Sequence, residues 1–396
     1  MPHQDPLAYL GEQLQAWKSA GTFQRLRQLE SACEPVCRFD GREVINLASN
    51  NYLGLANHPK LVEASIDAAR RFGAGSGAVR TISGTMTIHI ELEERIAAFK
   101  NVEACVVFQS GFAANSGTVS AVLGPEDHII SDELNHASII DGCRLSKAKI
   151  HVFAHRDANA AEAKLRALEG VPGHKLLITD GVFSMDGDIG PLPELVEVAD
   201  RYGAIMMVDD AHASGVLGRN GRGTIDHFGV HGRVAIQVGT LSKAVGVLGG
   251  YVCGSRDLID YLYHRARPFL FSTSHPPSVA AACLAAFDIL EKEPERIEKL
   301  WSNTRRFQSS LRDAGFSTGA SETPITPIMV GDAAKAFEFS RVLFEEGVLA
   351  TGIGYPTVPQ GKARIRAIVT AAHTEGQLDD AVEIFRRVAR RLQIIP

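Results

Sequence analysis

The segment VAIQVGTLSKAVGVLGGYVCG, from Val234 to Gly254, contains two short apolar runs separated by a Ser-Lys turn and a cluster of glycines. Continuous apolar runs of this length are typical of buried strands. Similar runs recur along the chain between helical patterns such as PLPELVEVADRYG, and this alternation predicts an α/β fold with a mainly parallel sheet. The seven strands that we expect are ACVVF, HIISD, IHVFAH, KLLITDGV, AIMMVDDA, VAIQVGT and GGYVCG.

Lys243 follows the VAIQVGT strand, and the glycines beyond it would let a ligand approach the backbone. A lysine in this position can hold an aldehyde cofactor as a Schiff base, which indicates pyridoxal phosphate (PLP). Asp209 and Asp210 end the AIMMVDDA strand, and open parallel sheets bind ligands at the carboxyl ends of their strands. We expect Asp209 to keep the pyridine nitrogen of PLP protonated, because Asp210 points to the opposite face. His212 is expected to hydrogen-bond the ring hydroxyl.

The run QSGFAAN, from Gln109 to Asn115, follows the ACVVF strand and predicts a strand-turn-helix cradle for the cofactor phosphate. Its cradle residues are Ser110, Gly111 and Phe112. The run lacks the lysine of a P-loop and the third glycine of a dinucleotide fingerprint, so it does not favour a nucleotide. His136, which follows the HIISD strand, is expected to lie over the cofactor ring and to exchange protons.

These runs, in this order, resemble the α-oxoamine synthases, a family of fold-type I PLP enzymes. The resemblance covers nearly the whole chain and includes NLASNNYLGLANHP, GAGSGAVRTISGT, TDGVFSMDGD, RPFLFSTSHPP and GKARIRAIVTAAHT. It implies a homodimer with active sites at the subunit interface and assigns catalysis to Lys243, His136, Asp209 and His212. The cofactor-binding residues that it implies are these four together with Ser110, Gly111, Phe112, Ser184 and Thr240, and with Ser272 and Thr273 reaching across from the second subunit.

Members of the family condense a small amino acid with an acyl-CoA thioester. The resemblance implies that Arg366 grips the carboxylate of the amino acid, assisted by Asn50 and Ser184, since a guanidinium can donate two hydrogen bonds to a carboxylate. Arg364 shares the same strand face, and the family match selects Arg366 over it. Lys243 would then remove the α-proton, and His136 would stabilise the developing oxyanion.

The motifs that resemble glycine C-acetyltransferase lead us to expect glycine and acetyl-CoA as substrates and 2-amino-3-oxobutanoate as the product. In 5-aminolevulinate synthases, the run GAGSGAVRTISGT usually offers polar residues to the carboxylate of succinyl-CoA where this chain has Val79 and Thr81. Val79 therefore argues against succinyl-CoA as the acyl donor. Gly249 and Gly250 follow Lys243 one residue sooner than in the glycine C-acetyltransferase pattern, a spacing more like that of 8-amino-7-oxononanoate synthase. A pimeloyl donor with alanine, or a broad range of acyl donors, therefore stays open. An aminotransferase or decarboxylase would share the lysine, aspartate and cradle. A non-catalytic subunit is disfavoured because the catalytic set is complete.

Composition suits a cytoplasmic enzyme. The chain has 396 residues, 45% hydrophobic and 22% charged, with a formal net charge of -5 and no basic block, so nucleic acid is not an expected partner. No apolar run is long enough for a membrane span, and the first residues lack the layout of a signal peptide. The six cysteines show no paired ligand spacing, so we expect free thiols and no metal.

The patterns predict three segments: an N-terminal arm over residues 1–55, a large PLP-binding domain over 56–290 and a smaller α+β domain over 291–396. Helices are expected from Pro6 to Ala20 and from Pro294 to Ala314. A final helix should begin after Thr374, with Gln377 completing a capping box.

Overall fold

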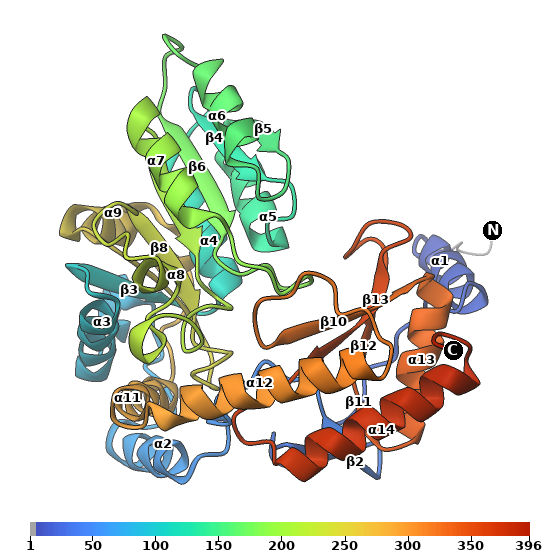
Figure 1. The fold of residues 1–396 in the computed structure, drawn as a ribbon. Coiled ribbons are helices and arrows are strands. Elements are labelled where there is room, and N and C mark those ends of the chain that lie inside the picture. The colour runs from blue at the N-terminus through green and yellow to red at the C-terminus, as the bar shows by residue number, and fades with distance from the viewer. Residues whose placement is uncertain (1–4) are drawn as a thin grey trace. The chain divides into compact units, whose positions relative to one another are not determined.

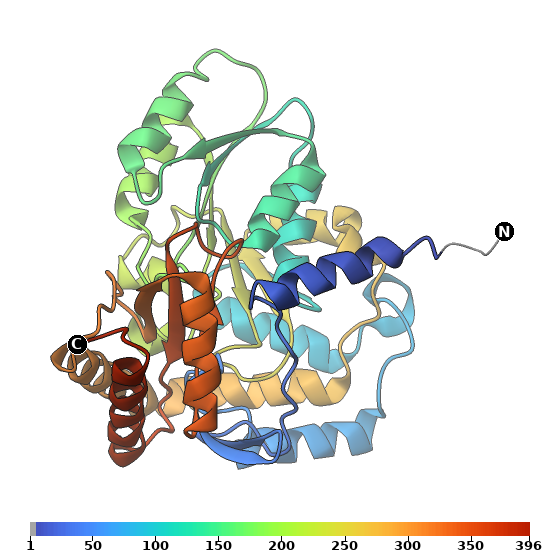
Figure 2. The same cartoon turned by 90° about the vertical axis from the view of Figure 1, so that its right-hand side faces the viewer.

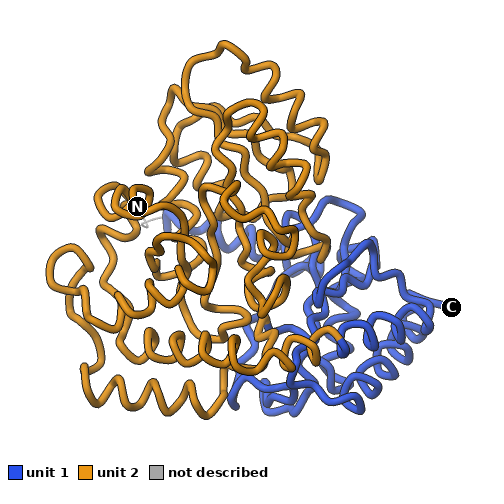
Figure 3. Tube along the Cα trace, turned by 60° about the vertical axis from the view of Figure 1, so that its left-hand side comes forward, with its two compact units in different colours: residues 1–49, 302–396 blue, residues 50–301 orange. Residues whose placement is uncertain are grey.

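A computed structural model describes residues 5–396, which form two compact units (Figure 3). The described residues up to Ser49 join Ser302–Pro396 in unit 1, and Asn50–Trp301 form unit 2. The predicted arm and the predicted C-terminal domain therefore fall largely in one unit, and the predicted large domain falls in the other. This grouping is not readable from the sequence, because it depends on strand pairing between the two ends of the chain.

Unit 2 is built on a sheet whose seven strands all lie where the apolar runs predict them (Figure 1). In order across the sheet they are β3 (Ala104–Phe108), β9 (Gly250–Gly254), β8 (Ile236–Thr240), β7 (Ile205–Asp209), β6 (Lys175–Asp180), β4 (His128–Asp132) and β5 (Lys149–Phe153). Every pairing is parallel except the two made by β9. The predicted fold class, a mainly parallel α/β sheet of fold type I, is confirmed.

Both faces of this sheet are apolar and covered by helices. Successive strand residues alternate between the faces, so Met207 packs into one core and Met206 into the other. The first core is completed by α4 (Gly111–Val122), α5 (Ala137–Ser146), α9 (Arg256–Arg265) and α10 (Arg267–Leu270), and the second by α6 (Ala158–Arg166), α7 (Leu192–Tyr202) and α8 (Thr224–His227). This burial on two sides explains why the strands read as continuous apolar runs.

The remaining helical segments of unit 2 lie before β3 and in the connections after β7 and β9. They are α2 (Pro59–Phe72), the π-helical turn η1 (Arg80–Gly84), α3 (Thr87–Lys100), the 3-10 turn η2 (Arg219–Gly221) and α11 (Pro277–Lys292). Helix α11 packs against both α2 and α3, and α3 packs against β3.

Unit 1 combines two small sheets with helices from both ends of the chain. One sheet has the order β1-β2-β11, with β1 (Val36–Phe39), β2 (Arg42–Asn46) and β11 (Val348–Leu349), and the other has the order β10-β13-β12, with β10 (Ile325–Gly331), β13 (Ala363–Ile368) and β12 (Thr351–Ile353). Asp40 and Gly41, both at positive φ, make the tight turn between β1 and β2. Parallel pairing of β2 with β11 joins the N-terminal segment to the C-terminal one.

Three of the helices assigned to unit 1 lie where they were predicted, and the fourth, α13, was not predicted. Observed bounds are α1 (Ala8–Ser19), α12 (Glu295–Asp313), which contains the boundary between the units, α13 (Ala333–Glu345) and α14 (Glu375–Arg391). Helix α13 packs on β12, β13 and α14 (Figure 2). Thr374 and Gln377 form the predicted capping box at the start of α14. Within residues 5–396, no helix combines the length and apolar content that crossing a bilayer requires.

Candidate active site

The predicted phosphate cradle lies at the carboxyl end of β3. Ser110 caps α4, and its Oγ accepts a hydrogen bond from the amide of Ala113 at 3.0 Å. Thr240, at the end of β8, lies against Gly111, where an added Cβ would come 3.5 Å from the Thr240 Oγ1. The structure thus brings Ser110, Gly111 and Thr240 together, with the exposed Phe112 next in the chain.

The structure explains why glycine occurs at positions 249 and 250, after Lys243. A Cβ on Gly250 would collide with the carbonyl oxygen of Ser110 and would lie 2.5 Å from the amide nitrogen of Gly111. Real side chains do not tolerate such approaches, so only glycine lets β9 start against the cradle. Gly249 has a φ of 131° and its carbonyl accepts a hydrogen bond from the Thr240 Oγ1 at 2.8 Å. The two glycines close the turn that carries Lys243.

Asp209 ends β7 and is buried, with 4% of its surface exposed. Its Oδ2 accepts a hydrogen bond from the Asn115 Nδ2 at 2.6 Å, and its Oδ1 accepts one from the amide of Ala211 at 2.8 Å. Asp210 points away from this site, as predicted from strand alternation, and pairs with the Nζ of Lys100 at 2.9 Å. Sequence reasoning quoted Asn115 within the cradle run but gave it no role.

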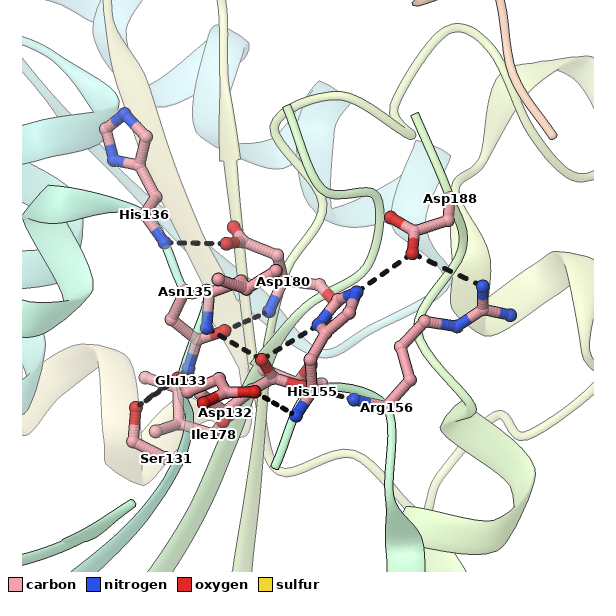
Figure 4. A network of polar contacts seen from close by, with 12 residues as sticks. Ser131, Asp132, Glu133, Asn135, His136, His155, Arg156, Ile178, Asp180 and Asp188 are labelled. Atoms are coloured by element: carbon pink, nitrogen blue, oxygen red, sulfur yellow. Dashed lines mark hydrogen bonds and ion pairs between the residues drawn. The ribbon is translucent and has the colours of Figure 1, made fainter. Parts of the chain in front are cut away.

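His136 caps α5 and is anchored through both its backbone and its ring. Figure 4 shows the backbone contact with Asp180. Its amide donates to the Asp180 Oδ2 at 2.7 Å, and its Nδ1 lies 2.7 Å from the Ser138 Oγ. Desolvation lowers the pKa of His136, the negative charge of Asp209 opposes this effect, and the positive charge of Lys243 adds to it. His136, Asp209 and Lys243 are therefore close enough to influence one another's charge.

Asp180 is a site residue that sequence reasoning missed. It ends β6 directly opposite Asp209 on β7, and burial raises the pKa of Asp180 well above its usual range, with the charge of Asp209 adding to the rise. Two carboxylates on adjacent strand ends are a recognisable signal of a functional site. That signal needs the strand register, which the sequence does not show.

His212 and Tyr52 form a hydrogen-bonded pair inside unit 2. The Nδ1 of His212 lies 2.7 Å from the Tyr52 hydroxyl, and both residues are buried. This contact orients the imidazole ring, since the hydroxyl holds one of its two nitrogens. Tyr52 lies within NLASNNYLGLANHP, one of the runs that carries the family resemblance, but no role had been predicted for it.

Ser184 lies in a turn that begins after β6 and is closed by a bridge between Val182 and Ile189. His155 anchors the turn: its Nε2 lies 2.9 Å from the Asp188 Oδ2, and its ring packs edge-on against Phe183 with centroids 4.4 Å apart (Figure 4). The position of Ser184 is therefore set by residues that follow β5 as well as by its own turn.

Ser272 and Thr273 were predicted to act on the site of a second subunit. In this chain, the backbone carbonyl of Thr273 accepts a hydrogen bond at 2.7 Å from the Nε2 of Gln109, the residue before the cradle. Thr273 also forms a backbone bridge with Val79. The segment is thus fixed beside the cradle of its own chain through its backbone, and the reach of its side chains to a partner stays a prediction.

The predicted carboxylate anchors lie in different units. Asn50 opens unit 2, and its carbonyl accepts from the amide of Tyr52 at 2.8 Å. Arg366 lies on β13 of unit 1, in register with Thr351 on β12, and is half-buried. Arg364 is buried on the same strand and its Nε donates to the carbonyl of Lys362 at 3.0 Å.

The residues of unit 2 fit PLP in their chemistry. Helix amides with the hydroxyls of Ser110 and Thr240 suit a phosphate, the Asp209 carboxylate suits a protonated pyridine nitrogen, and the Lys243 amine suits an aldehyde. The missing side chain at Gly250 keeps the cradle amides approachable. Fold and site together define a PLP-dependent transferase of fold type I.

Comparisons with known proteins agree with this class. The family model for class I and II aminotransferases matches residues 42–385. The chain is 61% identical to the 8-amino-7-oxononanoate synthase of Symbiobacterium thermophilum, over 98% of this chain and 99% of that protein, and 57% identical to that of Thermoanaerobacter pseudethanolicus, over 98% of each. A solved structure of SPT with PLP has a TM-score of 0.94 at 32% identity and covers 99% of this chain and 100% of that one. The chain belongs to the class I and II aminotransferase family, and within it to the α-oxoamine synthases.

The expectation of a glycine C-acetyltransferase is wrong, because the relatives that match at 61% and 57% identity are 8-amino-7-oxononanoate synthases. The motifs behind that expectation build the PLP site, and all branches of the family need that site. They carry little information about the acyl donor. The early Gly249 and Gly250 were the feature that pointed to the branch to which these relatives belong.

Proposed function

We propose that this protein forms 8-amino-7-oxononanoate from alanine and pimeloyl-CoA. The observation that carries the proposal is the identity of 61% and 57% to synthases of this product over nearly the entire chain. Both relatives align with this chain over nearly their full length, so the proposal takes the product named for them as the product of this chain. The proposal also agrees with the early glycine pair at Gly249 and Gly250.

The structure of the product identifies its two precursors. Its carbon chain up to the ketone equals a pimeloyl group, and the remainder, with the amine and a methyl group, equals alanine without its carboxylate. The reaction therefore forms one carbon–carbon bond between the acyl carbon and the α-carbon of alanine. Coenzyme A leaves as a thiol, and the carboxylate of alanine leaves as carbon dioxide.

PLP supplies a ring that accepts the electrons released at the α-carbon of the amino acid. Lys243 would hold the aldehyde of the cofactor through its amine, and its free amine would serve as the general base that takes the α-proton of alanine. Asp209 holds a proton on the pyridine nitrogen, which keeps the ring electron-poor. The hydrogen bonds from Asn115 and from the amide of Ala211 support this role, because they fix the orientation of the Asp209 carboxyl group.

Substrate recognition is assigned to side chains that bind carboxylate or carbonyl oxygens. Arg366 binds the carboxylate of alanine with two hydrogen bonds, and Asn50 and Ser184 complete the contact. His136 donates a hydrogen bond to the acyl oxygen as negative charge develops there. His212, whose ring is oriented by Tyr52, binds the ring hydroxyl of the cofactor.

We include a homodimer in the proposal, because unit 2 exposes large apolar side chains beside the segment that is predicted to reach a partner. Ile82 and Phe271 are 83% and 71% exposed, on the two segments that the bridge between Val79 and Thr273 joins. Large exposed apolar side chains on neighbouring segments are typical of interfaces. Phe271→Asp should shift the protein toward monomers in sedimentation velocity, and an unchanged dimer would argue against this face as the interface.

The test is release of free coenzyme A by the purified PLP-loaded protein. Four mixtures are compared, each of alanine or glycine with pimeloyl-CoA or acetyl-CoA, and the product is identified by mass spectrometry. We expect alanine with pimeloyl-CoA to give the highest kcat/KM and the mass of 8-amino-7-oxononanoate. Lys243→Ala is the inactive blank, and Lys149→Ala, an exposed lysine on β5, is the matched active control.

Higher kcat/KM for another amino acid and acyl donor would overturn the assigned reaction while leaving the family intact. Comparable turnover of several acyl chains would identify a synthase of broad specificity, since an apolar pocket discriminates by only a few kcal/mol per methylene, roughly 1–3. Conversion of the cofactor to its amine form by an amino acid alone would indicate an aminotransferase.

A further inference from the structure

Four polar side chains of unit 2 form an unbroken chain of hydrogen bonds between two predicted catalytic residues. The Nδ1 of His136 lies 2.7 Å from the Ser138 Oγ, the Ser138 Oγ lies 2.9 Å from the Asn115 Nδ2, and the Asn115 Nδ2 lies 2.6 Å from the Asp209 Oδ2. The chain passes from α5 through α4 to the end of β7. Ser138 has no role in the reaction as proposed so far, and Asn115 has one only as a hydrogen-bond donor to Asp209.

The direction of each hydrogen bond follows from the groups involved. An ionised Asp209 can only accept, so Asn115 must turn its NH2 group toward it. The same NH2 group donates to the Ser138 Oγ. With its oxygen occupied as an acceptor, the Ser138 hydroxyl directs its own proton to the Nδ1 of His136. The Ser138 amide also donates to this nitrogen, at 3.2 Å.

His136 is thereby left with an accepting Nδ1, and the proton of the neutral ring must reside on Nε2. This is the tautomer that can donate a hydrogen bond from the outer edge of the ring. The opposite tautomer would place a proton on Nδ1 against two donors. Ring tautomers follow from hydrogen-bond networks of this kind.

The orientation of the Asn115 side chain leaves its buried amide oxygen unsatisfied by the described residues. It is fully buried, and its Oδ1 has no hydrogen-bond partner among residues 5–396. Flipping the amide would let Oδ1 accept from the Ser138 hydroxyl, but it would place Oδ1 against the carboxylate of Asp209. The charge-assisted bond to Asp209 therefore decides the orientation. Gly142 allows the close packing involved, since an added Cβ there would come 3.1 Å from the Asn115 carbonyl oxygen.

We propose that Asn115 and Ser138 are positioning residues that fix the tautomer of His136 through the charge on Asp209. The proposal rests on the proposed function in one respect: the Nε2 proton of His136 then serves as the donor to the acyl oxygen. While Asp209 carries its negative charge, Asn115 and Ser138 keep Nδ1 unprotonated. The charged groups that also act on His136 are Asp180 on β6, through the His136 amide, and Lys243 after β8.

The test is nitrogen NMR of the histidine ring in the PLP-loaded protein labelled with ¹⁵N-histidine. The signals of His136 are identified by their loss in His136→Gln. In the unchanged protein we expect one neutral tautomer with the proton on Nε2. In Ser138→Ala the hydroxyl donor is gone, so we expect the titration midpoint of His136 to rise by about 0.5–1 pH unit, the effect of one neutral hydrogen bond.

Asn115→Ala provides a second, independent variant. Without the amide donor, the Ser138 hydroxyl can accept a hydrogen bond from a protonated Nδ1, so the titration midpoint of His136 should again rise and a second tautomer should appear. Ser146→Ala is the matched control, because Ser146 is a buried serine of the same helix whose Oγ donates only to the nearby Cys143 carbonyl at 2.6 Å. In this control variant, the His136 ring should have the same titration midpoint as in the unchanged protein.

An unchanged midpoint and tautomer in both Ser138→Ala and Asn115→Ala, in folded protein, would overturn the proposal. So would an equal shift in Ser146→Ala, because the effect would then come from general loosening of α5. The readout requires no substrate. A shifted midpoint in a protein that releases no coenzyme A from any donor would refute the proposed reaction and leave the hydrogen-bond chain intact.

Discussion

The most direct test of the site's framework concerns His155, which ties the Ser184 turn to the end of β4. Its Nδ1 lies 3.0 Å from the Asp132 Oδ1 and its Nε2 lies 2.9 Å from the Asp188 Oδ2. Desolvation alone would lower the pKa of His155, but the hydrogen bonds and charges of the two aspartates outweigh it and raise the pKa to about 9. At neutral pH, His155 is therefore a cation between two carboxylates.

The sign and size of the effect on stability follow from this rise. Because the pKa is raised in the folded state, the contribution to stability is complete below pH 6.5, the ordinary pKa of the group, and disappears as pH rises through about 9. A rise of this size corresponds to about 3 kcal/mol of unfolding free energy. For a unit of this length that amounts to a melting temperature lower by about 6–12 °C.

The assay compares the thermal melting of the unchanged protein with that of His155→Gln between pH 6 and pH 10, followed by circular dichroism. Glutamine keeps hydrogen-bonding groups but cannot carry the charge. The gap between the two melting temperatures should be largest at pH 6 and should close above pH 9. His264→Gln, an exposed histidine of the same unit, is the control and should melt like the unchanged protein. A gap that stays constant across this range would refute the reasoning, since it would reflect packing and not charge.

Two further changes test the cofactor site. Gly250→Ala should weaken PLP binding at least about tenfold, because overpacking costs about 1–3 kcal/mol and the added methyl group would collide with Ser110. Gly75→Ala, which meets no atom within 4 Å, should bind PLP normally, and equal binding by both variants in a cofactor titration would contradict the steric argument. Tyr52→Phe should lower kcat by about fivefold to tenfold through loss of the bond to His212, worth about 1 kcal/mol, without lowering the melting temperature by more than a few degrees. An unchanged kcat would show that His212 needs no such support.

The strands of unit 2 were predictable from the sequence because each is buried on both faces and therefore reads as an unbroken apolar run. The helix after Thr374 was predictable because its capping box is local in sequence. The joining of residues before Ser49 to the C-terminal unit was not predictable, since it rests on the pairing of β2 with β11. Such pairing links segments about 300 residues apart and leaves no local signature.

The residues of the candidate site also fall into those that the sequence could predict and those that it could not. Lys243, Asp209 and the cradle at Ser110 lie at strand ends in recognisable runs, so their neighbourhood follows from the topology of a parallel sheet. Asp180 and Asn115 were missed because their importance arises from contacts across strands and helices. The acyl donor was predicted wrongly because the motifs describe the PLP site that all branches share. Residues that define a donor pocket have no comparable signature.

The neighbouring carboxylates Asp209 and Asp210 show how one strand end can serve both reaction and stability. Asp210 is fully buried and its oxygens accept from the Lys100 Nζ and from the amide and hydroxyl of Thr224, so its acceptor capacity is used within the protein. Asp209 accepts from one amide side chain and one backbone amide, which leaves room for a ligand.

This difference predicts opposite phenotypes for the same substitution at adjacent positions. Asp210→Asn leaves the buried Lys100 without a charged partner and should lower the unfolding free energy by about 3–5 kcal/mol, measured by urea unfolding. Asp209→Asn should lower that free energy by less, about 1–2 kcal/mol, because the hydrogen bonds from Asn115 and from the amide of Ala211 lose their charge assistance. It should instead lower kcat by more than about a hundredfold, since the pyridine nitrogen loses the carboxylate that keeps it protonated. Equal losses of stability in the two variants would mean that Asp209 is a structural residue and that the ring-nitrogen partner must be sought elsewhere.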